Sequence, residues 1–319
     1  MFADHRQHRT FLPPEEFCPL CPTRPGGPPT EIPMPIFDVA VFENRFPALV
    51  RRPAAPTGAA APPYAVAPAS GANEVVVYSD DHHLGLADME PAGIARVVEV
   101  WTDRYVDLGR RDDIAYVFVF ENRGVAIGVT LSHPHGQIYA YPELPPRVRR
   151  RVEVAQAYLE TRSACVHCDV LAAESAAGIR LVARNGSFLA YVPFAARFPY
   201  EVHVAPLRHA PSLPDLTDAE RLDLAALLGV VLRGYDGLFG FPLPYVMSVH
   251  QAPTRGEDHR PASHLQIEFT PIHRTAEKLK YLAGSELGAG AFVNDTAPED
   301  TAARLRVAMA EAEEPGTRA

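Results

Sequence analysis

The sequence predicts an α+β protein built from two related halves, each a mainly antiparallel sheet with one long helix packed on it. Two observations support this fold class. Short strand-like runs surround one long segment of helical periodicity in each half of the 319-residue chain. A set of polar residues also recurs in the same order, which indicates an internal duplication. We therefore expect an N-terminal repeat over residues 1–150 and a C-terminal repeat over residues 151–319.

In the first half, a basic N-terminal segment is followed by several runs typical of strands. The Pro- and Ala-rich stretch Val50–Ala72 interrupts them and predicts a surface loop. The helix expected over residues 88–109 has Asp88 as its cap and Pro91 in its first turn. The predicted strands lie within IFDVAVFENRFPAL (36–49), EVVVYS (74–79), DIAYVFVFEN (113–122) and GVTLSHPHGQIYAYP (128–142).

The second half repeats this order after a basic helical segment, Arg147–Thr161. Its long helix is expected over Thr217–Phe239. The matching strands are IRLVARNGSFLAYVPF (179–194), EVHVAP (201–206), PYVMSV (244–249) and SHLQIEF (263–269).

The spacing of polar residues supports the duplication. Glu74 precedes His82 by eight residues, as Glu201 precedes His209. The segment Ser132–Gln137 then corresponds position by position to Ser263–Glu268, with Gln266 in place of the second histidine. The alternative, a chance similarity of two α/β stretches, explains this agreement less well.

Composition limits the possible partners. A net charge of −9 argues against nucleic acid, because phosphates need a basic surface. No apolar run approaches 18 residues, and no signal peptide is evident, which predicts a soluble, cytoplasmic protein without membrane contact. The four cysteines form two C-x-x-C pairs, which in such a protein favour a metal site or a redox pair over a structural disulfide.

The duplication favours the metal interpretation. Each pair of cysteines has two histidines at matching places in its half, one before a helix and one near a late strand. Two thiolates and two imidazoles are the ligands of a closed, tetrahedral, structural zinc site. Core histidines with inert thiols are the alternative. The predicted ligand sets are Cys18, Cys21, His82 and His133 in the first half, and Cys165, Cys168, His209 and His264 in the second.

His135 is left over as a candidate catalytic residue. If His133 binds zinc, His135 is not needed as a ligand and projects from the same side of the strand. A neutral imidazole is a good nucleophile toward phosphorus when its other nitrogen donates to a backbone carbonyl. Gly136 would allow a phosphate to approach the backbone. Gln137 would donate an amide N–H to a phosphoryl oxygen. A structural or pH-sensitive histidine is the alternative.

These motifs resemble those of the galactose-1-phosphate uridylyltransferases, a branch of the histidine-triad superfamily that has two such repeats. HPHGQ (133–137) is similar to the active-site signature of that family. HRQHRTFLPP, FENRFPAL, FENRGVAIGVTLSHPHGQIYAYP and EKLKYLAGSELGAGAFVND resemble four further blocks, so that the similarity spans nearly the whole chain.

The resemblance implies a nucleotidyltransferase that acts on UDP-hexose and hexose 1-phosphate through a uridylyl-histidine at His135, with ping-pong kinetics. It also implies a homodimer. Some members have a second metal held by a glutamate and three histidines, and the matching late-strand positions here are Gln266 and Glu268. The implied substrate-binding residues are Arg6, Arg9, Asn44, Asn122, Thr130, Gln137, Lys280 and Glu286.

Two other functions remain open at this point. One is a different nucleotidyl transfer in the same superfamily, such as an ADP-sugar phosphorylase or a transferase for an unusual sugar phosphate. The other is a non-catalytic, zinc-stabilised nucleotide-binding protein. Preference for the adenine or the uracil base distinguishes another nucleotidyltransferase from a uridylyltransferase. Loss of exchange activity on substitution of His135 distinguishes either enzyme from a non-catalytic protein.

Overall fold

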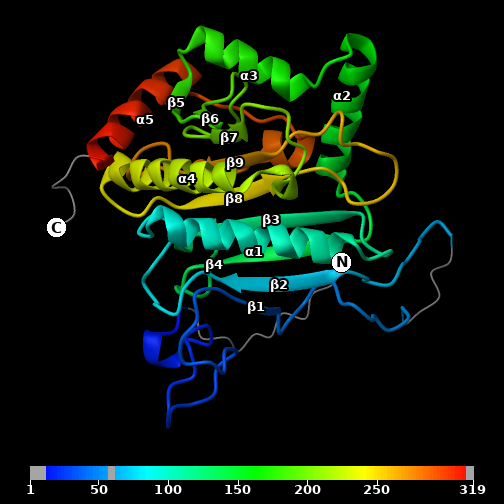
Figure 1. Cartoon of the computed structure of the whole chain (residues 1–319), viewed down its shortest axis with the longest axis vertical. Helices are drawn as coiled ribbons and strands as arrows, with labels where there is room; N and C mark the ends of the chain where they lie inside the picture. Colours follow the sequence, from blue (N-terminus) through cyan, green and yellow to red (C-terminus); the bar gives the residue numbers. More distant parts are fainter. Residues whose placement is uncertain (1–11, 57–61, 314–319) are drawn as a thin grey trace.

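The computed structural model describes residues 12–56 and 62–313. Its centre is one nine-stranded sheet in which every pair of neighbouring strands is antiparallel, in the order β1-β2-β4-β3-β8-β9-β7-β6-β5 (Figure 1). The strands are β1 (Ala40–Glu43), β2 (Ala72–Val77), β3 (Tyr116–Arg123), β4 (His135–Tyr141), β5 (Leu181–Arg184), β6 (Phe188–Tyr191), β7 (Val202–Pro206), β8 (Tyr245–His250) and β9 (Gln266–Pro271).

The α+β prediction is confirmed, and the structure adds how the two halves meet. Strands β1 to β4 come from the first half and β5 to β9 from the second. The halves join edge to edge where β3 pairs with β8, for example at Phe120 opposite Ser248. The two half-sheets are therefore one continuous sheet. Pairing two strands here removes two exposed edges that would otherwise attract other chains.

Two long helices lie side by side on one face of this sheet, α1 (Pro91–Gly109) and α4 (Asp218–Phe239) (Figure 1). Residues Ile94, Val98, Trp101 and Tyr105 of α1 are buried at the three- and four-residue spacing of an amphipathic helix. The strands alternate accordingly: Ile138 on β4 faces the helices in the main core, while its neighbours belong to the other face.

Three more helices pack around this centre. The basic helix predicted after the first half is α2 (Pro146–Arg162), which confirms that element. The helices α3 (Val166–Ala177) and α5 (Pro298–Glu313) were not predicted. α5 packs closely on α4, because Gly234 lacks the side-chain atom that would come within 2.3 Å of Met309. No helix in the described residues is long and apolar enough to cross a membrane.

Two local predictions were wrong. The last strand of the first half begins at His135 rather than near residue 128, because Pro134 has no N–H to donate to a neighbouring strand. His133 therefore precedes the strand. Asp88 does not cap α1: the N-cap is Glu90, with Pro91 at the first helical position as expected. Asp88 accepts instead from the backbone N–H of Gly85 at 3.3 Å.

Candidate active site and metal centres

The four residues of the first Cys₂His₂ set lie together, with His82 after the end of β2 and His133 before the start of β4. Sγ of Cys21 lies 3.2 Å from Nδ1 of His82 and 3.5 Å from Nδ1 of His133. The candidate ligand atoms of these residues and Cys18 all lie within 4.8 Å of one another, and all four residues are buried. A tetrahedral zinc ion with Zn–S of about 2.3 Å and Zn–N of about 2.0 Å separates S from N by about 3.5 Å, so the set fits.

The far nitrogen of each histidine also has a partner. Nε2 of His133 donates to the backbone carbonyl of Ser79 at 2.8 Å, which leaves the lone pair on Nδ1. Nε2 of His82 lies 3.0 Å from the hydroxyl of Ser132. Such partners fix the ring orientation and tautomer of metal-binding histidines. The geometry therefore suits a metal ion approached through Nδ1 of both rings.

The second Cys₂His₂ set repeats this arrangement at the start of α3. Sγ of Cys168 lies 3.5 Å from Nδ1 of His209 and 3.5 Å from Nδ1 of His264, with Cys165 in the same cluster. Nε2 of His264 donates to the carbonyl of Pro206 at 2.9 Å, as His133 donates to Ser79. The set differs in exposure, since Cys168 is half-buried and His209 is exposed.

His135 is the first residue of β4 and follows the first metal set directly. Its Nδ1 lies 2.8 Å from the backbone carbonyl oxygen of His133. A carbonyl can only accept, so Nδ1 carries the proton and Nε2 carries the lone pair. This is the tautomer expected of a nucleophilic imidazole, and the ring is half-buried at the protein surface.

A cavity of about 90 Å³ opens beside His135. The structure brings four of the predicted residues together on its walls: Asn44, Thr130, His135 and Gln137. The carbonyl of Thr130 also accepts from the backbone N–H of Leu12 at 3.0 Å, which ties the N-terminal segment to this wall. The other lining residues are Pro19, Leu20, Glu31, Phe42, Arg45, Val75 and Leu131.

The remaining predicted substrate residues lie elsewhere. Asn122 is on β3, opposite Val246 of β8, and does not line this cavity. Lys280 is buried and pairs with Glu286 at 3.1 Å, within the loop that contains the short helix Gly284–Ala289. Arg6 and Arg9 lie outside the described residues.

Gly136 has a different role from the one expected. It is buried, and a Cβ atom built on it would lie 2.3 Å from the hydroxyl of Tyr78 and 3.2 Å from the carbonyl oxygen of Phe120. Both atoms belong to the protein, so the missing side chain makes room for Tyr78 rather than for a phosphate. The interpretation of Gly136 as a phosphate-approach position is therefore not supported by this geometry.

The second half carries a charged cluster at the position that corresponds to the cavity. Gln137 of β4 and Glu268 of β9 lie in one row of directly opposed residues, connected through Phe120 and Ser248. On its other neighbouring strand, Gln137 is opposite Val75 of β2, whereas Glu268 is opposite His203 of β7. The two strands thus present equivalent positions on the same face of the sheet.

Ion pairs between two buried carboxylates and more exposed arginines occupy this second position. Glu268 accepts from Arg147 at 3.0 Å, from Arg197 at 2.9 Å and from Arg151. Glu201 accepts from Arg197 at 2.7 Å and from Nε2 of His203 at 2.8 Å. Glu201, His203 and Glu268 could hold a metal by residue type, but three guanidinium groups already neutralise the two carboxylates.

These charges also set the protonation of the cluster. Burial alone would raise the pKa of Glu268, but His250, His203 and Arg151 together hold that pKa well below its usual value of 4.5. Because burial lowers the pKa of His250 itself, we attribute the effect at neutral pH to the arginines. Arg151 and Arg197 were missed in the sequence, since nothing local links them to a strand more than 70 residues away.

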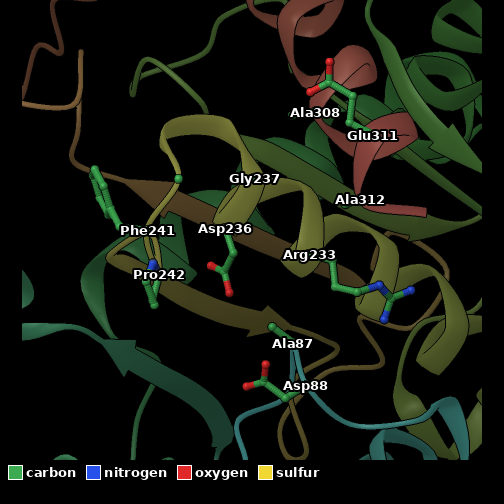
Figure 2. A pocket seen from close by; sticks show the side chains of 11 residues that line it. Ala87, Asp88, Arg233, Asp236, Gly237, Phe241, Pro242, Ala308, Glu311 and Ala312 are labelled. Atoms are coloured by element: carbon green, nitrogen blue, oxygen red, sulfur yellow. The ribbon is translucent and has the colours of Figure 1, made fainter. Parts of the chain in front are cut away.

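A much larger cavity, about 730 Å³, lies on the helical face, between the end of α4, α5 and the loop before α1 (Figure 2). Asp88 and Asp236 point toward its centre (Figure 2). Both oxygens of Asp236 accept from Arg123, at 2.6 and 2.7 Å. None of the predicted site residues lines this cavity, so size alone does not identify the active site.

A duplicated antiparallel sheet with one histidine presented at a small polar cavity defines a two-repeat α+β protein equipped for group transfer. The chain belongs to the galactose-1-phosphate uridyl transferase family: the models of its N-terminal and C-terminal domains match residues 3–145 and 151–315.

Individual relatives agree with this assignment. A galactose-1-phosphate uridylyltransferase of Thermotoga maritima is 41% identical over 94% of this chain and 92% of its own. One from Streptomyces lividans is 36% identical over 94% of this chain and 81% of its own. Among solved structures, a uridylyltransferase matches with a TM-score of 0.85 and 37% identity, covering 95% and 94% of the two chains. An ADP-glucose phosphorylase from Arabidopsis thaliana with bound ADP-glucose matches with 0.73 and 27%, covering 86% and 83%.

Proposed function

We propose that this protein is a UDP-glucose–hexose-1-phosphate uridylyltransferase that acts on galactose 1-phosphate. The observation that carries the proposal is His135, whose Nδ1 donates to a backbone carbonyl and whose ring borders a cavity with Gln137, Thr130 and Asn44. This arrangement occurs in a chain 41% identical to a protein named galactose-1-phosphate uridylyltransferase.

In the first half-reaction, Nε2 of His135 attacks the α-phosphorus of the UDP-hexose. The bond from this phosphorus to the bridging oxygen breaks, and hexose 1-phosphate leaves with its electron pair. The imidazole now carries a positive charge, which the Nδ1–H donation to the carbonyl of His133 stabilises. The amide of Gln137 donates to a phosphoryl oxygen as charge develops there.

In the second half-reaction, the phosphate oxygen of the other hexose 1-phosphate attacks the same phosphorus and displaces the imidazole. Thr130 and Asn44 contribute polar contacts to the phosphoryl and nucleoside parts of the substrate. The family resemblance adds Arg6, Arg9, Asn122, Lys280 and Glu286 as contacts to phosphate and hexose.

Mass spectrometry of the intact protein after incubation with UDP-glucose tests this proposal. We expect one UMP adduct per chain with wild-type protein and none with His135→Gly. Galactose 1-phosphate should then remove the adduct and yield UDP-galactose. Unchanged exchange in the His135→Gly variant would contradict this mechanism.

The same experiment separates the competing functions. An adduct formed with ADP-glucose but not with UDP-glucose would favour an ADP-sugar phosphorylase; the Arabidopsis relative is named an ADP-glucose phosphorylase. Nucleotide binding without any adduct would favour a non-catalytic zinc-stabilised protein.

We also propose that both Cys₂His₂ sets bind zinc. The support is the ligand chemistry, the S–N distances of 3.2 to 3.5 Å and the carbonyl acceptors behind His133 and His264. Four protein ligands leave no position for substrate, so each ion would have a structural role: the first would hold the segment before His135 in place. Metal analysis of the purified protein should give two zinc ions per chain.

Finally, we propose a homodimer in the cytoplasm. The C-terminal loop exposes several large apolar side chains close together in sequence, which a second copy would cover. The unpaired cysteine thiols needed for zinc binding are kept reduced in that compartment. Analytical ultracentrifugation should show a dimer that Leu287→Asp weakens. The exposed residues are Tyr281, Leu282, Leu287, Phe292 and Val293.

A further inference from the structure

We propose that Tyr78 is a positioning residue for His135. Its hydroxyl, bound by the buried carboxylate of Glu121, supports the backbone of β4 from the helical face of the sheet. This inference rests on the proposed function, because it concerns the rate at which His135 attacks phosphorus. Tyr78 follows β2 directly and lies on the helical side of the sheet, in the main core.

The backbone around Tyr78 is bonded to the segment that carries both histidines. The N–H of Tyr78 donates to the carbonyl of Pro134 at 3.4 Å. The carbonyl of the next residue, Ser79, accepts from Nε2 of His133 at 2.8 Å. One short stretch of chain therefore fixes the two residues that immediately precede His135.

The side chain of Tyr78 adds a contact with Gly136, the residue that follows His135. Its hydroxyl lies 2.3 Å from the point where a Cβ of Gly136 would be, and its ring carbon Cζ lies 3.2 Å from that point. The ring is 1% exposed and packs edge-on against Trp101 of α1, with 6.4 Å between the ring centroids. The hydroxyl thus supports the backbone of β4 directly behind the nucleophile.

Glu121 holds this hydroxyl in place. Oε2 of Glu121 accepts from Tyr78 at 3.3 Å, and Oε1 accepts from Tyr245 at 3.3 Å. Tyr245 begins β8, two strands away from β4, and has no comparable contact with Gly136. The same carboxylate therefore binds two buried tyrosines, of which one supports the nucleophile strand and the other does not.

Small displacements of His135 matter for its reaction. In-line attack requires Nε2 at about 3 to 3.5 Å from phosphorus, opposite the leaving oxygen. Loss of the Tyr78 hydroxyl would let β4 settle toward the helices and would move this nitrogen away from the substrate. Binding of the substrate, which depends on other residues of the cavity, should change little.

Two conservative variants test the proposal. Tyr78→Phe and Tyr245→Phe each remove one hydroxyl from Glu121, so the two should lower the melting temperature by similar amounts. Only Tyr78→Phe should slow adduct formation at saturating UDP-glucose, by about fivefold, the equivalent of one hydrogen bond of about 1 kcal/mol. The UDP-glucose concentration for half-maximal rate should stay within twofold of wild type in both variants.

A second experiment tests the contact itself. Gly136→Ala should slow adduct formation strongly, since the added methyl group meets the hydroxyl of Tyr78. Combining it with Tyr78→Phe should recover part of the lost rate, because the obstructing oxygen is gone. No recovery in the double variant would overturn the contact, and equal rates for Tyr78→Phe and Tyr245→Phe would overturn the positioning role. If the wild-type protein forms no UMP adduct, the proposed function fails instead, which is a distinct result.

Discussion

The two halves of this molecule contain corresponding strands, β4 and β9, at corresponding places in the sheet, but the side chains of these strands have different roles. On β4 of the first half, His135 and Gln137 border a cavity. On β9 of the second half, the corresponding residues are Gln266 and Glu268, which are both buried and both bound by half-buried arginines. Gln266 accepts from Arg151 at 2.6 Å, and Glu268 also binds Arg197. The difference shows that one position of a duplicated fold can serve either as an open site or as a closed, charge-compensated cluster.

The candidate zinc sets differ in a parallel way. All four residues of the first set are buried, whereas the second set includes a half-buried Cys168 and an exposed His209. The first set lies next to the segment that carries His135, while the second links the start of α3 to the strand of the ion-pair cluster. Substituting a ligand in either set tests whether the two halves depend equally on the proposed zinc ions.

We expect the largest effect from Cys18→Ser. Loss of a buried ligand should remove the first zinc ion and lower the melting temperature by at least about 10 °C, because zinc binding contributes directly to folding. Cys168→Ser should lower it by less, since that site is closer to solvent. His135→Ala, which removes no ligand, is the control and should leave both zinc content and melting temperature near wild type. Calorimetry with metal analysis measures this, and equal losses for Cys18→Ser and His135→Ala would contradict the zinc assignment.

A change in the ion-pair cluster should have the next largest effect. Glu268→Gln leaves Arg147, Arg151 and Arg197 without their shared carboxylate. Because these arginine side chains remain 22 to 54% exposed, water screens their charge in part, and we expect a cost of about 2 to 3 kcal/mol, as for hydrogen bonds to a charged group. Urea unfolding measures the loss in the free energy of unfolding. The matched control is Glu43→Gln, which breaks the exposed pair with Arg51 and should cost less than about 1 kcal/mol.

The same cluster should make stability depend on pH. The pKa values of Glu201 and Glu268 are both lowered in the folded protein, so their contribution is fully present above the unfolded value near 4.5. It is lost as the pH falls through the lower folded values. As the pH falls below about 4.5, the unfolding free energy of the wild type should therefore fall more steeply than that of Glu268→Gln. Parallel slopes would show that other groups cause the acid sensitivity.

The sequence predicted both Cys₂His₂ sets and the fold class well, because spacing within a duplication carries long-range information. Glu74 and Glu201 stand at equal distances before their histidines, and this spacing alone aligns the two halves. The four predicted residues among those that line the cavity could be named because they lie in contiguous motifs.

What the sequence could not predict depends on side-chain contacts between distant strands. Arg151 and Arg197 reach Glu268 from a helix and a loop, and no local pattern signals their direction. The role of Gly136 was misread for the same reason, since Tyr78, the residue after the neighbouring strand β2, approaches it. The C-terminal helix α5 was missed because only two residues of its buried face, Leu305 and Met309, are large and apolar, which is a weak periodic signal. The other buried residues are Thr301, Ala302 and Ala308.

The smallest expected effect concerns the two long helices of the halves, whose N-termini are built differently. Thr217 caps α4: its hydroxyl accepts from the N–H of Glu220 at 3.2 Å, and Glu220 in turn accepts from the N–H of Thr217 at 2.7 Å. Thr217→Ala should therefore cost about 1 kcal/mol of unfolding free energy. Within the described residues, the side chain of Asp88 before α1 accepts only from the loop N–H of Gly85, so Asp88→Ala should cost less than about 0.5 kcal/mol. Equal costs in urea unfolding would mean that Asp88 supports α1 after all, and that the two helices begin with more similar constraints than their N-caps indicate.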